Sequence, residues 1–211
     1  MYAEGPYFIA GNEEWAEYLN LHDGVLKGGF NYSLVRKGSD IGKLESVVNL
    51  HPGFPVNGES TLNPDYDTKK NLAFMEYEKA VAETEKLLTQ CGFPVMEVQE
   101  VYSLDAGTMR AKYLQRNKTD TENPENQYEW SEADECYLIH FRQTCDGIPL
   151  INILWEEGTR QDWNATETEI FAVYSRDGVI QIWAEGLYTI KEATEEGTSI
   201  RAAEALQALV D

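Results

Sequence analysis

The chain has 211 residues, of which 42% are hydrophobic and 26% are charged. Its 37 acidic residues outnumber the 17 basic ones and give a formal net charge of −20. This charge disfavours nucleic acids and anionic membrane surfaces as partners, because proteins bind both through Lys and Arg. The length is sufficient for a substantial core, in one large domain or two small ones.

The N-terminal part of the sequence predicts short elements. Residues 12–19 predict a short helix with Asn12 as its N-cap. Residues 30–35 and 44–48 alternate between apolar and polar side chains, which predicts two strands. Residues 52–66 are rich in proline and glycine and predict a loop.

The strongest helical pattern of the chain lies in residues 68–91, where apolar side chains recur at helical spacing. Gly92 is a suitable C-cap for this helix, and Pro94 prevents its continuation. The alternating residues 95–102 predict a strand, and we expect a second strand over residues 108–114.

The C-terminal half predicts antiparallel strands joined by tight turns. Residues 136–144 predict a strand that ends in a hairpin turn at Asp146-Gly147, and residues 148–155 predict its return strand. Residues 170–174 and 179–184 predict a second hairpin.

A helix over residues 198–206 is expected to close the chain, and the polar residues 115–134 are expected to form a loop. Consecutive hairpins exclude a doubly wound parallel sheet, which requires helical crossovers. We therefore expect an α+β fold of antiparallel sheets with the long amphipathic helix packed on one face. The side chains expected to be buried against that helix alternate along the strands: Tyr137, Ile139, Phe141, Ile151, Ile153, Val173 and Ile182.

Motifs for catalysis, metal binding or cofactor binding are not found in the sequence. The three histidines have no metal-ligand spacing, and no phosphate-binding glycine loop or nucleophile elbow occurs. We therefore expect no catalytic residues, no metal site and no cofactor. Trp130 and Trp163 lie in polar loops, and we predict that these two side chains contact a ligand.

The three cysteines form no C-x-x-C pair. Cys136 and Cys145 lie roughly 30 Å apart along one predicted strand, at ~3.3 Å per residue, so they are not expected to pair with each other. A bridge from Cys91 to either one remains open, and three free buried thiols are the preferred alternative.

Residues 137–150 (YLIHFRQTCDGIPL), 173–180 (VYSRDGVI) and the closing segment 199–206 carry a family resemblance. They resemble uncharacterised secreted or lipid-anchored proteins of Gram-positive gut bacteria, with similarity to YycH/YycI-type regulators, PepSY-like domains and thermolysin propeptides. The resemblance covers roughly residues 72–211. It implies a helix on an antiparallel sheet, an extracytoplasmic location and no catalysis.

We predict an N-terminal β-rich segment at 1–71 and a helix-plus-sheet region at 72–211, or one continuous domain. The predicted function is an exported, non-enzymatic binding or regulatory protein with a protein partner or small ligand at the cell surface. The alternative is a carbohydrate- or peptide-active surface enzyme that uses acids near Trp130 or Trp163. No segment is apolar for the ~20 residues that a membrane helix requires. The first residues also lack a signal-peptide pattern, so an exported protein would have lost its signal or anchor before residue 1.

Overall fold

The computed structural model describes residues 7–11, 13–21, 30–50, 63–116, 128–153, 165–167, 169–185 and 187. Its strands are β1 Tyr7–Gly11, β2 Trp15–Leu21, β3 Phe30–Arg36, β4 Asp67–Thr68, β5 Met96–Leu104, β6 Cys136–Cys145, β7 Ile148–Pro149, β8 Ile151–Ile153, β9 Ala165–Glu167, β10 Glu169–Ser175 and β11 Gly178–Glu185. Its helices are α1 Ile41–Glu45, α2 Tyr77–Gln90, α3 Ala106–Arg116 and the 3-10 helix η4 Glu132–Asp134.

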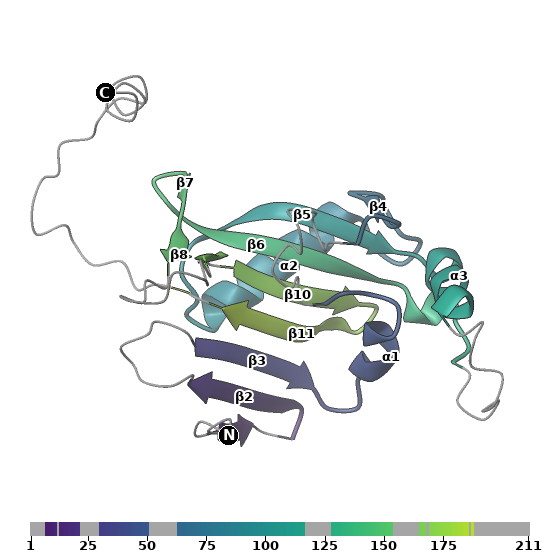
Figure 1. Ribbon diagram of the computed structural model, residues 1–211, viewed down its shortest axis with the longest axis horizontal. Helices are drawn as coiled ribbons and strands as arrows, with labels where there is room; N and C mark the ends of the chain where they lie inside the picture. The colour runs from purple at the N-terminus through teal and green to yellow at the C-terminus, as the bar shows by residue number, and fades with distance from the viewer. Residues whose placement is uncertain are drawn as a thin grey trace, which may run out of the picture.

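One large antiparallel sheet organises the molecule, in the order β1-β2-β3-β11-β10-β6-β5-β4, with β7 paired to β6 (Figure 1). Strands β8 and β9 form a separate pair. The expected α+β class with an antiparallel sheet is therefore correct. Strand β3 pairs with β11, so strands from before residue 71 and after it share this sheet. Whether 1–71 and 72–211 are separate domains stays a prediction.

The two hairpin turns of the C-terminal half match the sequence expectation. Asp146 and Gly147 adopt φ values of 51° and 76° between β6 and β7, as a type I′ turn requires. Strands β10 and β11 pair across the turn that precedes Gly178, with a register shift between Val173 and Tyr174. Each turn is encoded by an Asp-Gly dipeptide, which tolerates the unusual backbone angles locally.

The return strand expected over residues 148–155 is confirmed only in part: short strands lie at 148–149 and 151–153, and residues 154 and 155 lie outside the described residues. Ile148 and Pro149 pair with β6, the Leu150 N–H donates a hydrogen bond to the Gln143 carbonyl at 3.0 Å, and Ile148 is 67% exposed. The chain then leaves to form β8 with β9, and β10 takes the place beside β6. The local turn is therefore correct, whereas the partner of the central strand is set by a segment more distant in sequence.

Three short predictions in other parts of the chain are wrong. The helix expected over 12–19 is strand β2, which pairs with both β1 and β3. The strand expected over 44–48 overlaps helix α1, whose N-terminus is capped by Asp40. The strand expected over 108–114 lies in helix α3, where the Asp105 Oδ1 accepts a hydrogen bond from the Thr108 N–H at 2.9 Å.

The long helix expected over 68–91 is shorter, because α2 starts at Tyr77 and has 14 residues. Strand β4, which pairs with β5, takes up the first residues of the expected helix. The Tyr137 hydroxyl accepts a hydrogen bond from the Leu72 N–H and donates one to the Met75 carbonyl, both at 2.6 Å. This bridge holds a turn that precedes the helix.

Both faces of the sheet are covered, whereas a helix on one face was expected. Helix α2 lies behind the sheet in Figure 1, while α1 and α3 gather at its right-hand end. The α2 face buries Tyr137, Ile139, Phe141 and Ile182, as expected. Val173 instead belongs to the opposite face, and the side chains of Ile151 and Ile153 are not among those described.

The second core is formed on the opposite face, at the α1/α3 end. Leu44 of α1 and Met109 of α3 pack there with Leu138, Phe171 and Val173 of the sheet. Because β6 contributes to both cores, Leu138 and Ile139 are both 0% exposed. A central strand with two buried faces explains why His140 is also buried, at 7% exposed.

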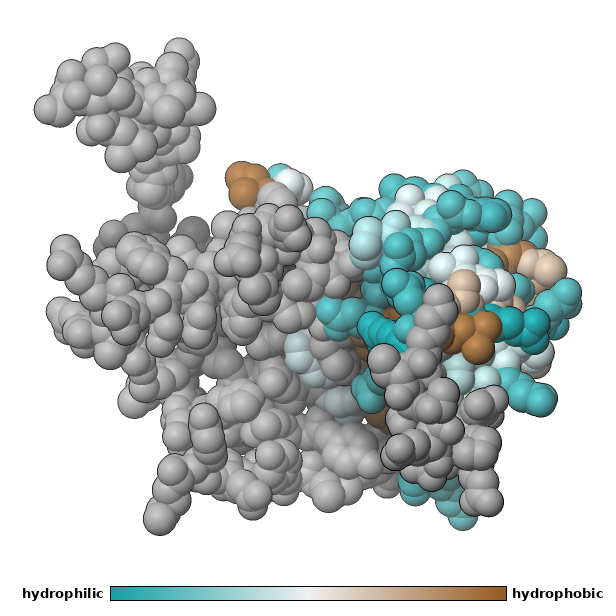
Figure 2. Space-filling view, turned by 45° about the vertical axis from the view of Figure 1, so that its right-hand side comes forward, coloured by the Kyte–Doolittle hydropathy of each residue, from teal (hydrophilic) through white to brown (hydrophobic). Residues whose placement is uncertain are grey.

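The described surface outside these cores is mainly hydrophilic, with small separate hydrophobic patches (Figure 2). Within the described ranges, no helix has the length and apolar character needed to cross a membrane. The helix expected over 198–206 lies outside the described residues.

Candidate functional site

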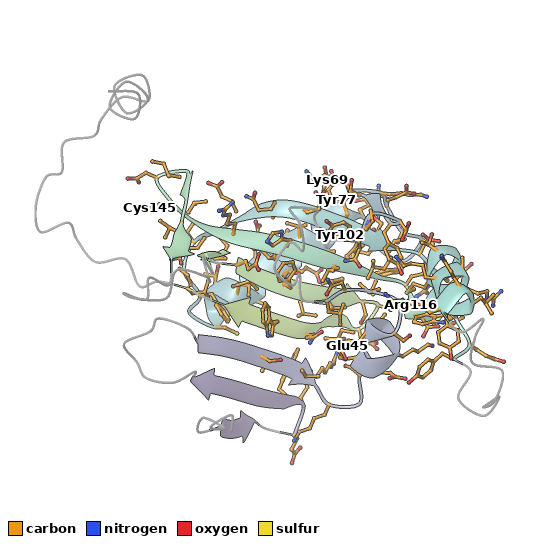
Figure 3. All side chains as sticks on the ribbon, in the orientation of Figure 1. Glu45, Lys69, Tyr77, Tyr102, Arg116 and Cys145 are labelled. Carbon is orange, nitrogen blue, oxygen red and sulfur yellow. The ribbon has the colours of Figure 1, made fainter. Side chains whose placement is uncertain are left out.

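A pocket with a volume of about 290 Å³ opens at the α1 end of the sheet. Three segments line it: the β3–α1 connection with α1, the η4–β6 connection, and the β10–β11 hairpin. Figure 3 labels Glu45 of α1 and Arg116 of α3, which mark this end of the molecule. The lining residues are Arg36, Lys37, Gly38, Ser39, Asp40, Lys43, Leu44, Ala133, Asp134, Cys136, Ser175, Asp177 and Ile180.

The backbone between β3 and α1 brings the basic side chains to this pocket. Gly38 has a φ of 86°, which permits the chain to turn away from the sheet directly after Arg36. Asp40 then caps α1, because its Oδ1 accepts a hydrogen bond from the Lys43 N–H at 3.0 Å. The turn and the cap together place Arg36 and Lys43 on one rim.

Lys43 is held on two sides. Its Nζ forms an ion pair with Asp134 Oδ1 at 2.5 Å and lies 4.8 Å from the centre of the Trp130 ring. Burial raises the pKa of Asp134, but hydrogen bonds from Lys43 and Ser131 outweigh it and hold that pKa below its usual value. Asp134 is therefore a permanent carboxylate at neutral pH, and it keeps the ammonium group in position.

Arg36 is anchored to two other segments. It donates a hydrogen bond to the carbonyl oxygen of Asp177 in the β10–β11 turn, and its Nη2 lies 3.0 Å from Glu14 Oε1. These contacts tie together the tips of two hairpins. The guanidinium thus has a fixed place beside the pocket, although its side chain remains 31% exposed.

Leu44, Cys136 and Ile180 supply the apolar part of the lining and belong to the adjoining core. Burial, followed by the nearby charges of Asp134 and Glu135, raises the pKa of the Cys136 thiol far above its ordinary value. The thiol is therefore protonated at neutral pH and acts as a small apolar group rather than as a nucleophile.

All three cysteines are free, so a bridge from Cys91 is not formed. Only Cys136 is buried; Cys145 is partly exposed and Cys91 is exposed, which corrects the expectation of three buried thiols. Among the described residues, no group of three or more Cys, His, Asp or Glu side chains is arranged to hold a metal ion.

Trp130 is 3% exposed and packs in an aromatic cluster with Tyr113 and Tyr128. It does not line the pocket itself but supports Lys43, which does. Trp163 lies outside the described residues. Direct ligand contact by Trp130 and Trp163 stays a prediction.

A second polar cluster lies within the sheet, near its other end. His140 Nε2 and Glu169 Oε2 are 2.9 Å apart, and both residues are less than 9% exposed. The His140 ring stacks on Phe171 with a centroid distance of 4.4 Å. The cross-strand side chain of Glu169 gives the buried His140 ring a hydrogen-bond partner.

The pocket residues were not singled out from sequence, because they are contributed by three segments that are distant in sequence: 36–44, 133–136 and 175–180. One local signal was available: Ser39-Asp40 before an apolar residue is a typical helix start, and Lys43 follows at the position that the cap orients. The Asp134 end carries a second such signal. The Ser131 hydroxyl accepts from the Ala133 N–H, and Asp134 accepts from the Ser131 N–H, as in a capping box.

No family model matches this chain, and no curated protein or solved structure is significantly similar to it.

Proposed function

We propose that this chain is an exported, non-enzymatic binding protein that holds a small polar ligand in the pocket at the α1 end. The observation that carries the proposal is a pair of cationic side chains, Arg36 and Lys43, fixed beside an apolar floor. The floor of the pocket is formed by Leu44, Cys136 and Ile180. A protein with a net charge of −20 has few cations to place. Two of them are fixed by ion pairs at one concave site, which is typical of ligand recognition.

The chemistry of the lining favours binding over catalysis. A general acid or base works best with a pKa near the operating pH. Asp134 has a lowered pKa and Cys136 a strongly raised one, so neither changes its protonation state near neutral pH. The extracytoplasmic location and the regulatory role are part of the proposal, and the family resemblance of residues 72–211 supports them.

The experiment is a ligand screen on the whole chain, with thermal stabilisation as the first readout and amide chemical-shift changes as the second. Ser39→Trp, in the pocket lining, is expected to abolish binding by filling the space. Thr89→Trp, an exposed position on α2 at the opposite face, is the matched control and is expected to bind normally.

A ligand that binds equally well to the Ser39→Trp protein would contradict the assignment of the pocket. Turnover of a screened carbohydrate or peptide that disappears in Asp134→Asn would favour the enzyme alternative. The location is tested separately, by digestion of surface proteins on intact cells of the source organism.

A further inference from the structure

The charges around the pocket are balanced rather than uniformly positive. Three cationic side chains and three carboxylates line it: Arg36, Lys37, Lys43, Asp40, Asp134 and Asp177. A multiply charged anion such as a phosphate would meet these carboxylates as well as the negative field of the whole chain. Like charges at an interface disfavour binding, so this lining discriminates against such a ligand.

Arg36 and Lys43, which form the cationic rim of the pocket, still have N–H donors for a ligand carboxylate. An ammonium group has three N–H donors, and the ion pair with Asp134 takes one from Lys43. A guanidinium has five donors, and the contacts of Arg36 with Asp177 and Glu14 are made by its two terminal nitrogens. A carboxylate bound here would receive charge-assisted hydrogen bonds without breaking the structural ion pairs.

The opposite charge is presented by the neighbouring segments. Asp177 lies exposed in the β10–β11 turn, and its backbone carbonyl already contacts Arg36. Asp40 uses Oδ1 to cap α1, and the carboxylate has a second oxygen. A ligand ammonium group can therefore be bound beside the site that takes the carboxylate.

Apolar side chains of Leu44 and Ile180, together with the protonated Cys136 thiol, form the remaining surface. This surface favours an aliphatic group, because burial of apolar area is the main gain available there. A volume of about 290 Å³ suits a ligand of the size of an amino acid or a very short peptide.

We infer that the ligand of this pocket is a small zwitterion with an apolar side chain, of the class of free aliphatic amino acids. The inference rests on the proposed function. The carboxylate is held by Lys43 and Arg36, the ammonium group by Asp177 and Asp40, and the side chain by the apolar floor. Trp130 acts as a positioning residue, because its ring packs against the Lys43 ammonium group.

Three matched probes test the charge pattern on the full chain by chemical-shift titration at pH 7. L-leucine carries both charges, L-leucinamide lacks the carboxylate, and isocaproate lacks the ammonium group. Because a hydrogen bond to a charged group contributes appreciably to binding, we expect leucine to bind at least roughly tenfold more tightly than either analogue.

Two variants separate the two halves of the site. Lys43→Met is expected to weaken leucine and isocaproate but not leucinamide, and Lys43→Arg to restore most of the loss. Asp177→Asn is expected to weaken leucine and leucinamide but not isocaproate. Lys79→Met, which removes an exposed lysine on α2, is the charge-matched control and should leave all three affinities unchanged.

Isocaproate or leucinamide binding as tightly as leucine would overturn the zwitterion assignment, as would equal behaviour of Lys43→Met and Lys79→Met. If other compounds bind in the pocket while these three do not, the ligand class is wrong and the proposed function stands. If nothing binds there at all, the proposed function itself fails.

Discussion

Replacement of Phe141 by alanine is expected to be among the most destabilising single changes in the chain. Phe141 is 0% exposed at the centre of β6, in the core shared with Ile139, Ile182 and Leu88 of α2. Truncation removes buried apolar area and leaves a cavity, at a combined cost of about 3–5 kcal/mol. That is a large part of the 5–15 kcal/mol by which domains are ordinarily stable.

The assay is urea unfolding of the whole chain, followed by far-ultraviolet circular dichroism and tryptophan fluorescence. We expect a lower midpoint with an unchanged slope, and a melting temperature lower by roughly 6–20 °C at ~2–4 °C per kcal/mol. Val95→Ala is the control, because Val95 is 79% exposed and its truncation should change stability by less than about 0.5 kcal/mol. A loss below about 1 kcal/mol for Phe141→Ala would refute the burial of this side chain between β6 and α2.

Three further changes test other parts of the structure. Gly147→Val should cost about 1–2 kcal/mol in urea unfolding, because Gly147 has a φ of 76° and open space around it, so backbone strain is the main effect; unchanged stability would contradict the turn. His140→Phe should destabilise the protein by about 1–3 kcal/mol, because it leaves Glu169 buried without this partner. The double variant His140→Phe/Glu169→Leu should recover part of the loss. A double-mutant cycle in which the two effects simply add would contradict an interaction between these two side chains. Burial raises the pKa of Asp105, but the hydrogen bonds from Thr108 outweigh it and hold this pKa below its ordinary value of 3.8. The Asp105 carboxylate therefore stabilises the fold above the unfolded pKa near 3.8, and this contribution is lost as the pH falls through the lower folded pKa. Asp105→Asn should therefore lose less stability than the wild type in urea titrations between pH 5 and pH 2, and parallel curves would refute this.

The sequence predicted the elements whose information is local. Strands β6, β10 and β11 are rich in apolar, β-branched and aromatic residues, and each hairpin contains an Asp-Gly dipeptide that fixes the turn. Strand β3 and the core positions of β6 were correct for the same reason. What periodicity did not reveal was that β6 is buried on both faces, because the residues of the second core come from α1, α3 and β10.

Errors occurred where a cap or a distant partner decides the conformation. Helix α3 depends on Asp105 at its start and on the buried side chains Met109 and Tyr113, which lie one turn apart. Within the few residues 108–114 this helical spacing was mistaken for the alternation of a strand. Strand β2 is a strand because β1 and β3 flank it, and pairing outweighs the helix signal of its acidic residues. Helix α2 is shortened by two distant partners: strand β5, which pairs with β4, and the Tyr137 hydroxyl, which bonds to Leu72 and Met75.

The pocket arises where the central strands end. Strands β3, β10 and β11 reach their turns at this end, and β6 begins there, so one edge of the core is met by turns and by the short helices α1 and η4. The strand ends and the segments that connect them expose polar groups, and here they carry both charges: Arg36 at the end of β3, Asp134 before β6 and Asp177 between β10 and β11. The ion pairs of Arg36 with Glu14 and of Lys43 with Asp134, and the hydrogen bond from Arg36 to the Asp177 carbonyl, join these segments, so collapse of the rim onto the apolar residues below would require breaking them. The rim side chains are therefore already fixed above the apolar floor. A ligand with charges opposite to theirs and an apolar group can bind with little further ordering of these side chains, so the entropic cost of binding is small.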